Sequence, residues 1–229
     1  MNICKKGVSI ITSTNRLNYM RNIYSNYLNQ SYKNKELIII LNNNYLNMDK
    51  WKVNSKSYDN VRIYQLSYKV SLGDCLNYAV EKSNYDIIAK FDDDDIYHCD
   101  YLTDSLKSFT YTDADIVGKS TVYIYFEENN TLALLNPNNE NRYLERVHGA
   151  TLIVNKYVFG KIKFQNINIG EDIKFCKDCK KNGYKIYSTN KNYYVYIRHS
   201  NNHTWSIDNN DLMRQCKIIG ALESPITTL

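Results

Sequence analysis

Four aspartates in a row, Asp92 to Asp95, are the residues whose type and spacing most directly indicate chemistry. Adjacent carboxylates repel one another, so such a run disfavours a compact turn unless a cation or hydrogen bonds compensate. Oxygen ligands suit Mg²⁺ or Mn²⁺, which share their coordination shells with substrate phosphates. A solvated acidic loop or a helix N-terminus is the alternative interpretation. We favour a metal site, because the run directly follows an apolar strand predicted over Asp86–Phe91.

A second acidic pair, Glu171 and Asp172, opens a helix that the pattern predicts over Glu171–Asn182, closed by Gly183. A carboxylate within hydrogen-bond reach of a hydroxyl group can act as its general base. Acidic residues are also favoured in the first turn of any helix, and the residues by themselves favour this plainer interpretation.

Arg198, His199 and His203 form a third group, in a polar segment that follows a strand predicted over Tyr193–Arg198. Histidine suits Mn²⁺ better than Mg²⁺, and arginine can hold a phosphate by bidentate hydrogen bonds. The alternative is a surface loop with two solvated histidines. Both interpretations stay open, with His199 preferred to His203 as a ligand.

Strands and helices must alternate to bring these groups together. Continuous apolar runs predict buried strands over Val8–Thr14, Glu36–Leu41, Val61–Leu66 and Asp86–Phe91, separated by helices over 17–29 and 71–83. Ser71 with Asp74 three residues later indicates a capped helix start. This order predicts an α/β fold with a mostly parallel central sheet and helices on both faces.

Polar clusters follow three of these strands, at Thr12–Arg16, Asn42–Asn44 and Asp92–Asp95. In parallel sheets, ligands bind at the carboxyl ends of the strands. The convergence of polar groups at that edge predicts a binding site there.

The second half of the chain has shorter apolar runs. They predict strands over Ile116–Gly118, Thr121–Phe126, Leu132–Leu135, His148–Val154 and Tyr184–Ser188, and a terminal helix over Asp211–Leu222. No repeat or linker is evident, so we expect one domain over residues 1–229. Its parts are a ligand-binding half at about 1–115, a catalytic half at about 116–205 and a tail at about 206–229.

Composition excludes several classes of protein. The net charge of +5 fits a small anionic substrate or peripheral contact with an anionic membrane, but no Lys/Arg run supports nucleic-acid binding. Six irregularly spaced cysteines predict a reduced, cytoplasmic protein, and the lone Cys176–Cys179 pair does not predict zinc. No signal peptide or transmembrane segment is expected. The chain ends after Pro225 without a clear stop, which is compatible with a fragment of a longer protein.

Three segments, Val8–Arg16, Leu37–Asn42 and Asp86–Leu102, resemble the family 2 glycosyltransferases in order and spacing. The resemblance covers about residues 7–200 and is close to a subgroup of bacterial envelope and spore-coat enzymes. It implies a GT-A, Rossmann-like fold and the metal-dependent, inverting transfer of a sugar from a nucleotide-diphosphate sugar to an unidentified hydroxyl acceptor. The resemblance favours a UDP-sugar as the donor and Mn²⁺ or Mg²⁺ as the cofactor. It implies a cytoplasmic location, at the membrane periphery or at the forming spore surface.

The resemblance also assigns roles to single residues. Asp94, Asp92 and His199 would ligate the metal, and Asp172 would be the catalytic base. His148, Gly149 and Glu171 would line the side of the acceptor and donor sugar, with Gly149 permitting close backbone approach. The nucleotide-sugar would contact Thr12, Ser13, Thr14, Arg16, Asn42, Gly73, Asn77, Asp92, Asp93 and Arg198. Asn42 replaces an aspartate that is usual in the family, which leaves the choice of nucleotide open.

Two other functions compete with this interpretation. One is a GT-A scaffold that binds nucleotide-sugar or polysaccharide without turnover, as a structural or assembly protein. The other is a nucleotidyltransferase, which would usually carry a glycine-rich phosphate loop after the first strand. Thr12–Arg16 contains no glycine, which counts against the second function.

Overall fold

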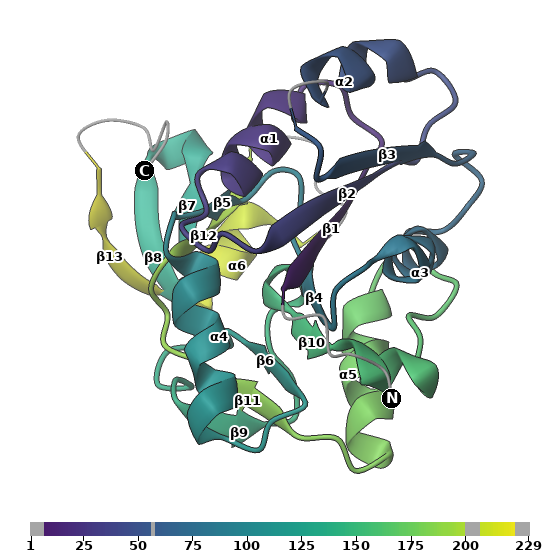
Figure 1. The fold of residues 1–229 in the computed structure, drawn as a ribbon. Helices are drawn as coiled ribbons and strands as arrows, with labels where there is room; N and C mark the ends of the chain where they lie inside the picture. Colours follow the sequence, from purple (N-terminus) through teal and green to yellow (C-terminus); the bar gives the residue numbers. More distant parts are fainter. Residues whose placement is uncertain (1–6, 56–57, 200–206, 223–229) are drawn as a thin grey trace.

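The computed structural model describes residues 7–55, 58–199 and 207–222, which form two β-sheets with surrounding helices (Figure 1). The larger sheet has the strand order β3-β2-β1-β4-β10-β6-β11-β9. Its strands are β1 (Val8–Thr14), β2 (Lys35–Leu41), β3 (Val61–Gln65), β4 (Ile87–Lys90), β6 (Ile116–Gly118), β9 (Arg142–Leu144), β10 (Ile153–Asn155) and β11 (Ile186–Ser188). Strands β1 to β4 run parallel, and β10 joins β4 in the antiparallel sense. The predicted, largely parallel central sheet is confirmed.

Helices cover both faces of this sheet, as the unbroken apolar strands predict. Helices α1 (Met20–Leu28), α2 (Met48–Ser55) and α4 (Tyr101–Tyr111) pack on the face that carries Ile10 and Ile39. Helices α3 (Leu72–Lys82) and α5 (Glu171–Lys181) pack on the face that carries Ile11 and Ile38. Successive strand residues point to opposite faces, so neighbouring isoleucines serve two separate cores.

The smaller sheet, in the order β13-β8-β7-β12-β5, was not predicted as a separate unit. It contains β5 (Ile96–Tyr97), β7 (Val122–Phe126), β8 (Thr131–Leu135), β12 (Tyr194–Arg198) and β13 (Lys217–Ala221). The 3₁₀ turn η1 (Glu127–Asn129) lies between β7 and β8, and helix α6 (Asn209–Arg214) lies between β12 and β13. Two further 3₁₀ turns, η2 (Gly149–Thr151) and η3 (Lys156–Gly160), precede and follow β10 of the larger sheet. Strand β5 follows the aspartate run directly and pairs with β12, which places the end of β12 beside that run.

Two predicted elements are wrong. The strand predicted over His148–Val154 begins as the turn η2, because the Thr151 hydroxyl donates to His148 O at 2.7 Å and closes the turn. The helix predicted over Asp211–Leu222 ends at Arg214, and the following residues form β13 along the edge of β8. Pairing with an available sheet edge outweighs the weak helical pattern there.

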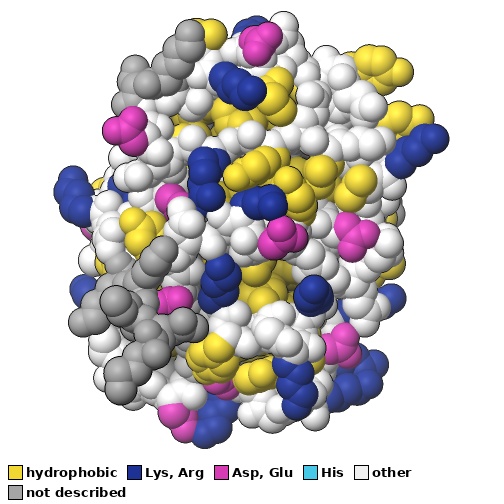
Figure 2. Space-filling model, turned by 45° about the vertical axis from the view of Figure 1, so that its right-hand side comes forward, with side chains coloured by type: hydrophobic (Ala, Val, Ile, Leu, Met, Phe, Trp, Pro, Cys, Tyr) yellow, Lys and Arg dark blue, Asp and Glu magenta, His cyan; other side chains and the backbone are white. Residues whose placement is uncertain are grey.

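Two local signals are confirmed. The Ser71 hydroxyl accepts from the Asp74 N–H at 3.2 Å and caps α3. Gly183 follows α5 with φ of +82°, a left-handed conformation that suits glycine after a helix. On the face shown in Figure 2, Lys and Arg side chains are spread among acidic and apolar ones and form no single basic block. Within the described ranges, no helix has the length and apolar character needed to cross a bilayer.

Candidate active site

The loop after β4 divides the four aspartates into two alternating pairs. The side chains of Asp92 and Asp94 are 38% and 16% exposed, whereas Asp93 and Asp95 are buried. An extended chain turns alternate side chains to opposite sides. Only the first and third carboxylates of the run therefore reach solvent together, which is the spacing of an Asp-x-Asp motif.

Asp95 anchors the loop to the smaller sheet. Its carboxylate accepts from the Tyr194 hydroxyl at 2.6 Å and from the Ile197 N–H at 3.0 Å. Its carbonyl oxygen accepts from the amides of Asn22 and Asn26 on α1, at 2.9 and 2.8 Å. Burial, with the charges of neighbouring aspartates, raises the pKa of Asp95 well above its usual range. Asp95 therefore fixes the loop rather than offering a ligand atom.

Arg16 stands as a cation between Asp93 and Asp94. Its guanidinium pairs with Asp93 and donates to Asp94 at 2.8 Å, while the Thr14 hydroxyl donates to Asp93 at 2.5 Å. Burial lowers the pKa of Arg16, but the two carboxylates outweigh burial and raise it. The guanidinium also lies 4.2 Å from the centre of the Tyr19 ring. This network explains how adjacent aspartates coexist before a metal ion arrives.

His199 also lies close to Tyr19. Its ring centre is 5.6 Å from that of Tyr19, and its Nδ1 is 2.6 Å from the Glu127 carboxylate. Tyr19 thus contacts both the His199 imidazole and Arg16, and Arg16 donates to Asp94. His203 lies outside the described residues.

Arg198 has an architectural role in this structure. Only 2% of the residue is exposed. Its guanidinium donates to Asn209 at 2.6 Å, to Tyr196 at 3.2 Å and to the Ile207 carbonyl. These bonds hold the segment before α6 against β12. Contact between Arg198 and a phosphate stays a prediction.

The acidic pair opens α5, as the sequence indicates. Gly170 precedes the helix with φ of +77°, and Asp172 is half-buried. A Cβ atom on Gly149 would lie 2.1 Å from the Asp172 Oδ2. Gly149 does permit a close approach, but the group that approaches is this carboxylate. Any other residue at 149 would displace it.

Glu171 and His148 complete this side of the site. Glu171 is buried, and burial raises its pKa to about 7 although the charge of Lys90 opposes the shift. His148 is half-buried with its Nδ1 3.4 Å from the Tyr194 hydroxyl. Burial lowers the pKa of His148, and the charges of Asp172 and Asp92 act against this. Both carboxylates are therefore close enough to His148 to influence it.

Lys90 is a functional candidate that the sequence argument missed. It ends β4 with 5% exposure, and its ammonium pairs with the Asp92 carboxylate. Burial lowers the pKa of Lys90, but Asp92, Glu171 and Asp172 outweigh burial and raise it. The available signal was a single charged residue at the end of an otherwise apolar, buried strand.

Several residues predicted to bind the nucleotide have partners within the protein. Thr12 is buried beneath the site with 1% exposure, and Ser13 is half-buried. The Asn42 amide donates to the carbonyls of Ser67 and Val70, at 2.8 and 3.1 Å, and so holds the loop between β3 and α3. Base or ribose contacts by these residues stay predictions.

Gly73 and Asn77 position the segment that leads into α5. The Asn77 amide donates to Phe164 O at 2.8 Å and accepts from Phe164 N at 3.0 Å. A Cβ on Gly73 would lie 1.8 Å from the Gln165 carbonyl oxygen. These contacts account for both residues without a nucleotide, and the predicted contact of α3 with the base stays a prediction.

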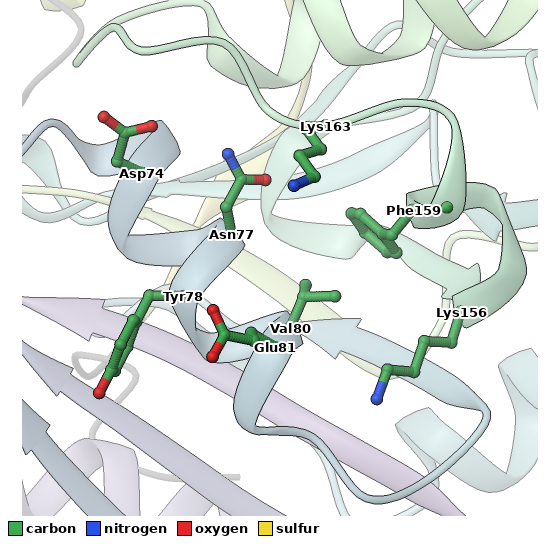
Figure 3. Close-up of a pocket in the computed structure, with 9 residues that line it drawn as sticks. Asp74, Asn77, Tyr78, Val80, Glu81, Lys156, Phe159 and Lys163 are labelled. Carbon is green, nitrogen blue, oxygen red and sulfur yellow. The ribbon is translucent and has the colours of Figure 1, made fainter.

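A cavity of about 470 Å³ lies between α3 and η3, and Asn77 is the one predicted site residue that lines it (Figure 3). Asp74, Asn77 and Glu81 border it from α3, and Lys156 and Phe159 from the opposite wall. It contains neither the aspartate run nor Asp172. We place the active site at the strand ends, because the perturbed titratable groups gather there.

The ligand chemistry of the predicted metal-binding residues suits a divalent cation, since Asp92 and Asp94 present carboxylate oxygens and His199 a nitrogen that suits Mn²⁺. Within residues 7–55, 58–199 and 207–222, the one three-residue group of possible ligands within 4.8 Å of one another is instead His98, Cys99 and Asp100, which are consecutive in a loop. Metal ligation by Asp92, Asp94 and His199 stays a prediction, and it would leave much of the shell of the ion to phosphates.

Comparisons with known proteins identify the family and the fold. The family model for glycosyl transferase family 2 matches residues 9–170. A structure of TarS from S. aureus in complex with UDP-GlcNAc superposes with a TM-score of 0.69 and 14% identity, covering 91% of this chain and 64% of that one. The mannosyltransferase PcManGT from Pyrobaculum calidifontis, in complex with GDP-Man and Mn²⁺, gives a TM-score of 0.62 and 13% identity, covering 86% and 58%.

A comparison with curated proteins finds no matching sequence. This chain spans about three fifths of the length of the two related structures. The similarity in structure shows the GT-A fold, and the family match extends over more than half of the chain, from β1 to the start of α5. The chain therefore belongs to glycosyl transferase family 2.

Proposed function

We propose that this protein is a metal-dependent, inverting glycosyltransferase that moves a sugar from a nucleotide-diphosphate sugar to an acceptor hydroxyl. One observation carries the proposal: Asp92, one of the two solvent-reaching carboxylates of the aspartate run, pairs with Lys90, and the charges of both Asp92 and Asp172 act on Lys90 and His148. A donor held at the first pair would thus lie beside a base. We place the enzyme in the cytoplasm, at the membrane periphery or the forming spore surface, in polysaccharide synthesis.

On the donor side, Asp94, Asp92 and His199 would hold the divalent ion, which would supply positive charge next to the diphosphate that leaves. Arg16 is the adjacent cation, and its release from Asp94 would free a guanidinium that can bind a phosphate.

On the acceptor side, Asp172 takes the proton of the attacking hydroxyl. The hydroxyl oxygen attacks the anomeric carbon from the face opposite the diphosphate, and the bond to the diphosphate breaks in the same displacement. Inversion therefore needs no covalent enzyme intermediate.

The donor is the next part of the proposal. TarS was solved with UDP-GlcNAc and PcManGT with GDP-Man and Mn²⁺, so these two nucleotide-sugars are the first to be tested here. We favour the UDP-sugar. Asn42 does not decide between the nucleotides, because it is neutral where an aspartate is usual and its amide holds the loop between β3 and α3.

Two variants separate binding from chemistry. Asp94→Ala should abolish Mn²⁺-dependent stabilisation by UDP-GlcNAc or GDP-Man, measured as a shift in melting temperature. Asp172→Asn should keep that stabilisation while transfer or donor hydrolysis falls by about 10²- to 10⁴-fold. Transfer by Asp172→Asn at the wild-type rate would show that another group is the base. Donor binding by the wild type without any turnover would instead support a non-catalytic scaffold.

A further inference from the structure

Three metal-ligating side chains meet in the turn between β5 and α4, outside the site described above. They belong to His98, Cys99 and Asp100, and their ligand atoms lie within 4.8 Å of one another. All three residues are partly exposed, so an ion in the solvent can reach them. The proposed sugar transfer uses none of them. An imidazole, a thiol and a carboxylate gathered on consecutive residues therefore call for a separate explanation.

The residues that follow α1 hold the backbone of this turn in place. Gln30 is 1% exposed, and its side-chain amide donates to His98 O at 2.8 Å and accepts from the Leu102 N–H at 3.0 Å. The Ser31 N–H donates to Cys99 O at 2.7 Å. Hydrogen bonds within the protein interior rigidify the groups that they join. The turn is therefore in position before any ion binds.

Two of the three side chains also have orienting partners. The His98 ring lies 5.5 Å from that of Tyr193, and the His98 N–H donates to Tyr193 O at 3.0 Å. The Asp100 Oδ1 accepts from the Ser31 hydroxyl at 2.9 Å. Within the described part of the chain, the Asp100 carboxylate precedes α4 without capping its backbone. Hydrogen bonds of this kind orient ligands in metal sites.

The distance between two of the ligand atoms matches a tetrahedral zinc site. Cys99 Sγ lies 3.5 Å from His98 Nδ1. Bonds of about 2.3 Å from zinc to sulfur and about 2.0 Å to nitrogen place these two atoms about 3.6 Å apart in a tetrahedron. The thiol and the imidazole therefore need almost no movement to share one ion. A hydrogen bond between them has a similar length, and only metal binding also uses the nearby carboxylate.

We propose that His98, Cys99 and Asp100 form a second metal site, which binds Zn²⁺ through the imidazole, the thiolate and one carboxylate oxygen, with water in the fourth position. Sulfur and nitrogen ligands favour Zn²⁺ over Mg²⁺, so this site selects a softer ion than the aspartate run does. The thiol releases its proton to the solvent as the sulfur–zinc bond forms, so binding should tighten as the pH rises. Zinc binding here does not depend on glycosyl transfer.

The first test replaces Zn²⁺ by Co²⁺, because a thiolate ligand gives Co²⁺ a charge-transfer absorption that oxygen and nitrogen ligands do not. Titration of the metal-free, reduced protein with CoCl₂ should produce this band, and ZnCl₂ should remove it. Asp94→Ala should keep the band, since the aspartate run offers no sulfur. Cys99→Ser should abolish it. Cys216→Ser is the matched control, because it removes another partly exposed cysteine, and it should behave like the wild type.

The second test measures Zn²⁺ affinity by competition with a coloured chelator. Loss of an orienting partner typically weakens a metal site by about 10- to 100-fold. Ser31→Ala should therefore weaken binding by about 10-fold, and His98→Ala and Asp100→Asn, which each remove a ligand, by about 100-fold or more. Zn²⁺ should raise the melting temperature of the wild type more than that of Cys99→Ser. Melting curves without metal show whether each variant folds.

Three results would overturn the proposal. The first is a wild-type protein that gives no charge-transfer band with Co²⁺. The second is a band that survives in Cys99→Ser, which would assign the ion to another cysteine. The third is a band that needs Cys99 while Zn²⁺ affinity is unchanged in both His98→Ala and Asp100→Asn, which would reduce the site to a single thiol. If His98→Ala fails to fold, Asp100→Asn still decides this point, since it preserves the size of the side chain.

Discussion

The acidic loop after β4 and the acidic start of α5 hold their carboxylates in different ways. In the loop, Asp93 and Asp95 receive hydrogen bonds from Arg16, Thr14, Tyr194 and the Ile197 backbone. At the helix start, Asp172 lies against the Cα of Gly149 and in the electrostatic reach of Lys90.

The two groups of carboxylates are therefore held in position in two different ways, by hydrogen bonds in the loop and by close packing at the helix start. Hydrogen bonds from α1 and β12 fix the loop through many partners, so the loss of one ligand carboxylate leaves the others in place. The proposed base, Asp172, depends instead on the space that the missing side chain of Gly149 leaves. Its geometry is therefore more sensitive to a small steric change, whereas the loop is more important for the stability of the fold. Four predictions test this comparison.

The largest effect is expected from Gly149→Ala. The new methyl group would overlap Asp172 Oδ2, Cγ and Cβ, so the carboxylate must move and the start of α5 must shift slightly with it. A displacement of about 1 Å is expected to lower kcat on the order of 100-fold, with Mn²⁺ and donor binding unchanged by calorimetry. Gly160→Ala is the matched control, because no atom lies within 4 Å of its added Cβ. Equal kcat values in the two variants would contradict the steric argument.

Asp95→Ala should mainly cost stability. The Tyr194 hydroxyl and the Ile197 N–H would lose their buried acceptor, so the free energy of unfolding should fall by about 2 kcal/mol. Urea denaturation of the metal-free protein measures the loss. Asp94→Ala is the control and should change stability by less than about 1 kcal/mol, since its ion pair with Arg16 is partly solvated. A larger loss in Asp94→Ala than in Asp95→Ala would reverse the assigned roles.

Arg16→Gln should alter metal binding more modestly. The guanidinium competes with an added ion for Asp94, so its removal should tighten the binding of Mn²⁺ alone by several-fold, about 1 kcal/mol. Isothermal titration with MnCl₂ in the absence of nucleotide measures this. Arg62→Gln, which removes an ion pair to Glu36 far along the sheet, should leave the affinity unchanged. Weaker binding by Arg16→Gln would mean that Arg16 organises the site for the ion.

The smallest effect concerns Glu171→Gln. The Glu171 pKa is raised to about 7, so wild-type stability should decline as the pH rises from its unfolded value towards neutrality. The glutamine variant carries no titrating group at position 171. Its melting temperature should therefore change less with pH over this range, and it should exceed that of the wild type at higher pH. Parallel curves for the two proteins would show that Glu171 is ionised in the fold throughout.

Much of the fold was predictable because local patterns decide it. Neighbouring residues are enough to predict the apolar strands β1 and β2, the Ser71 cap of α3 and the start of α5 at Glu171. The Asp-x-Asp spacing was visible for the same reason. In contrast, β13 forms only because β8 presents an edge, which a pattern in residues 211–222 cannot reveal.

Sequence alone determined that acidic groups follow β4 and open α5, since strand and helix periods are properties of neighbouring residues. Tertiary structure decided which aspartates reach solvent, that Gly149 makes room for Asp172, and that the buried Lys90 pairs with Asp92. The physical reason is that burial and charge coupling depend on residues up to about a hundred positions apart, such as Asp95 and Ile197. Residues so far apart in the sequence come into contact only when both sheets have packed together.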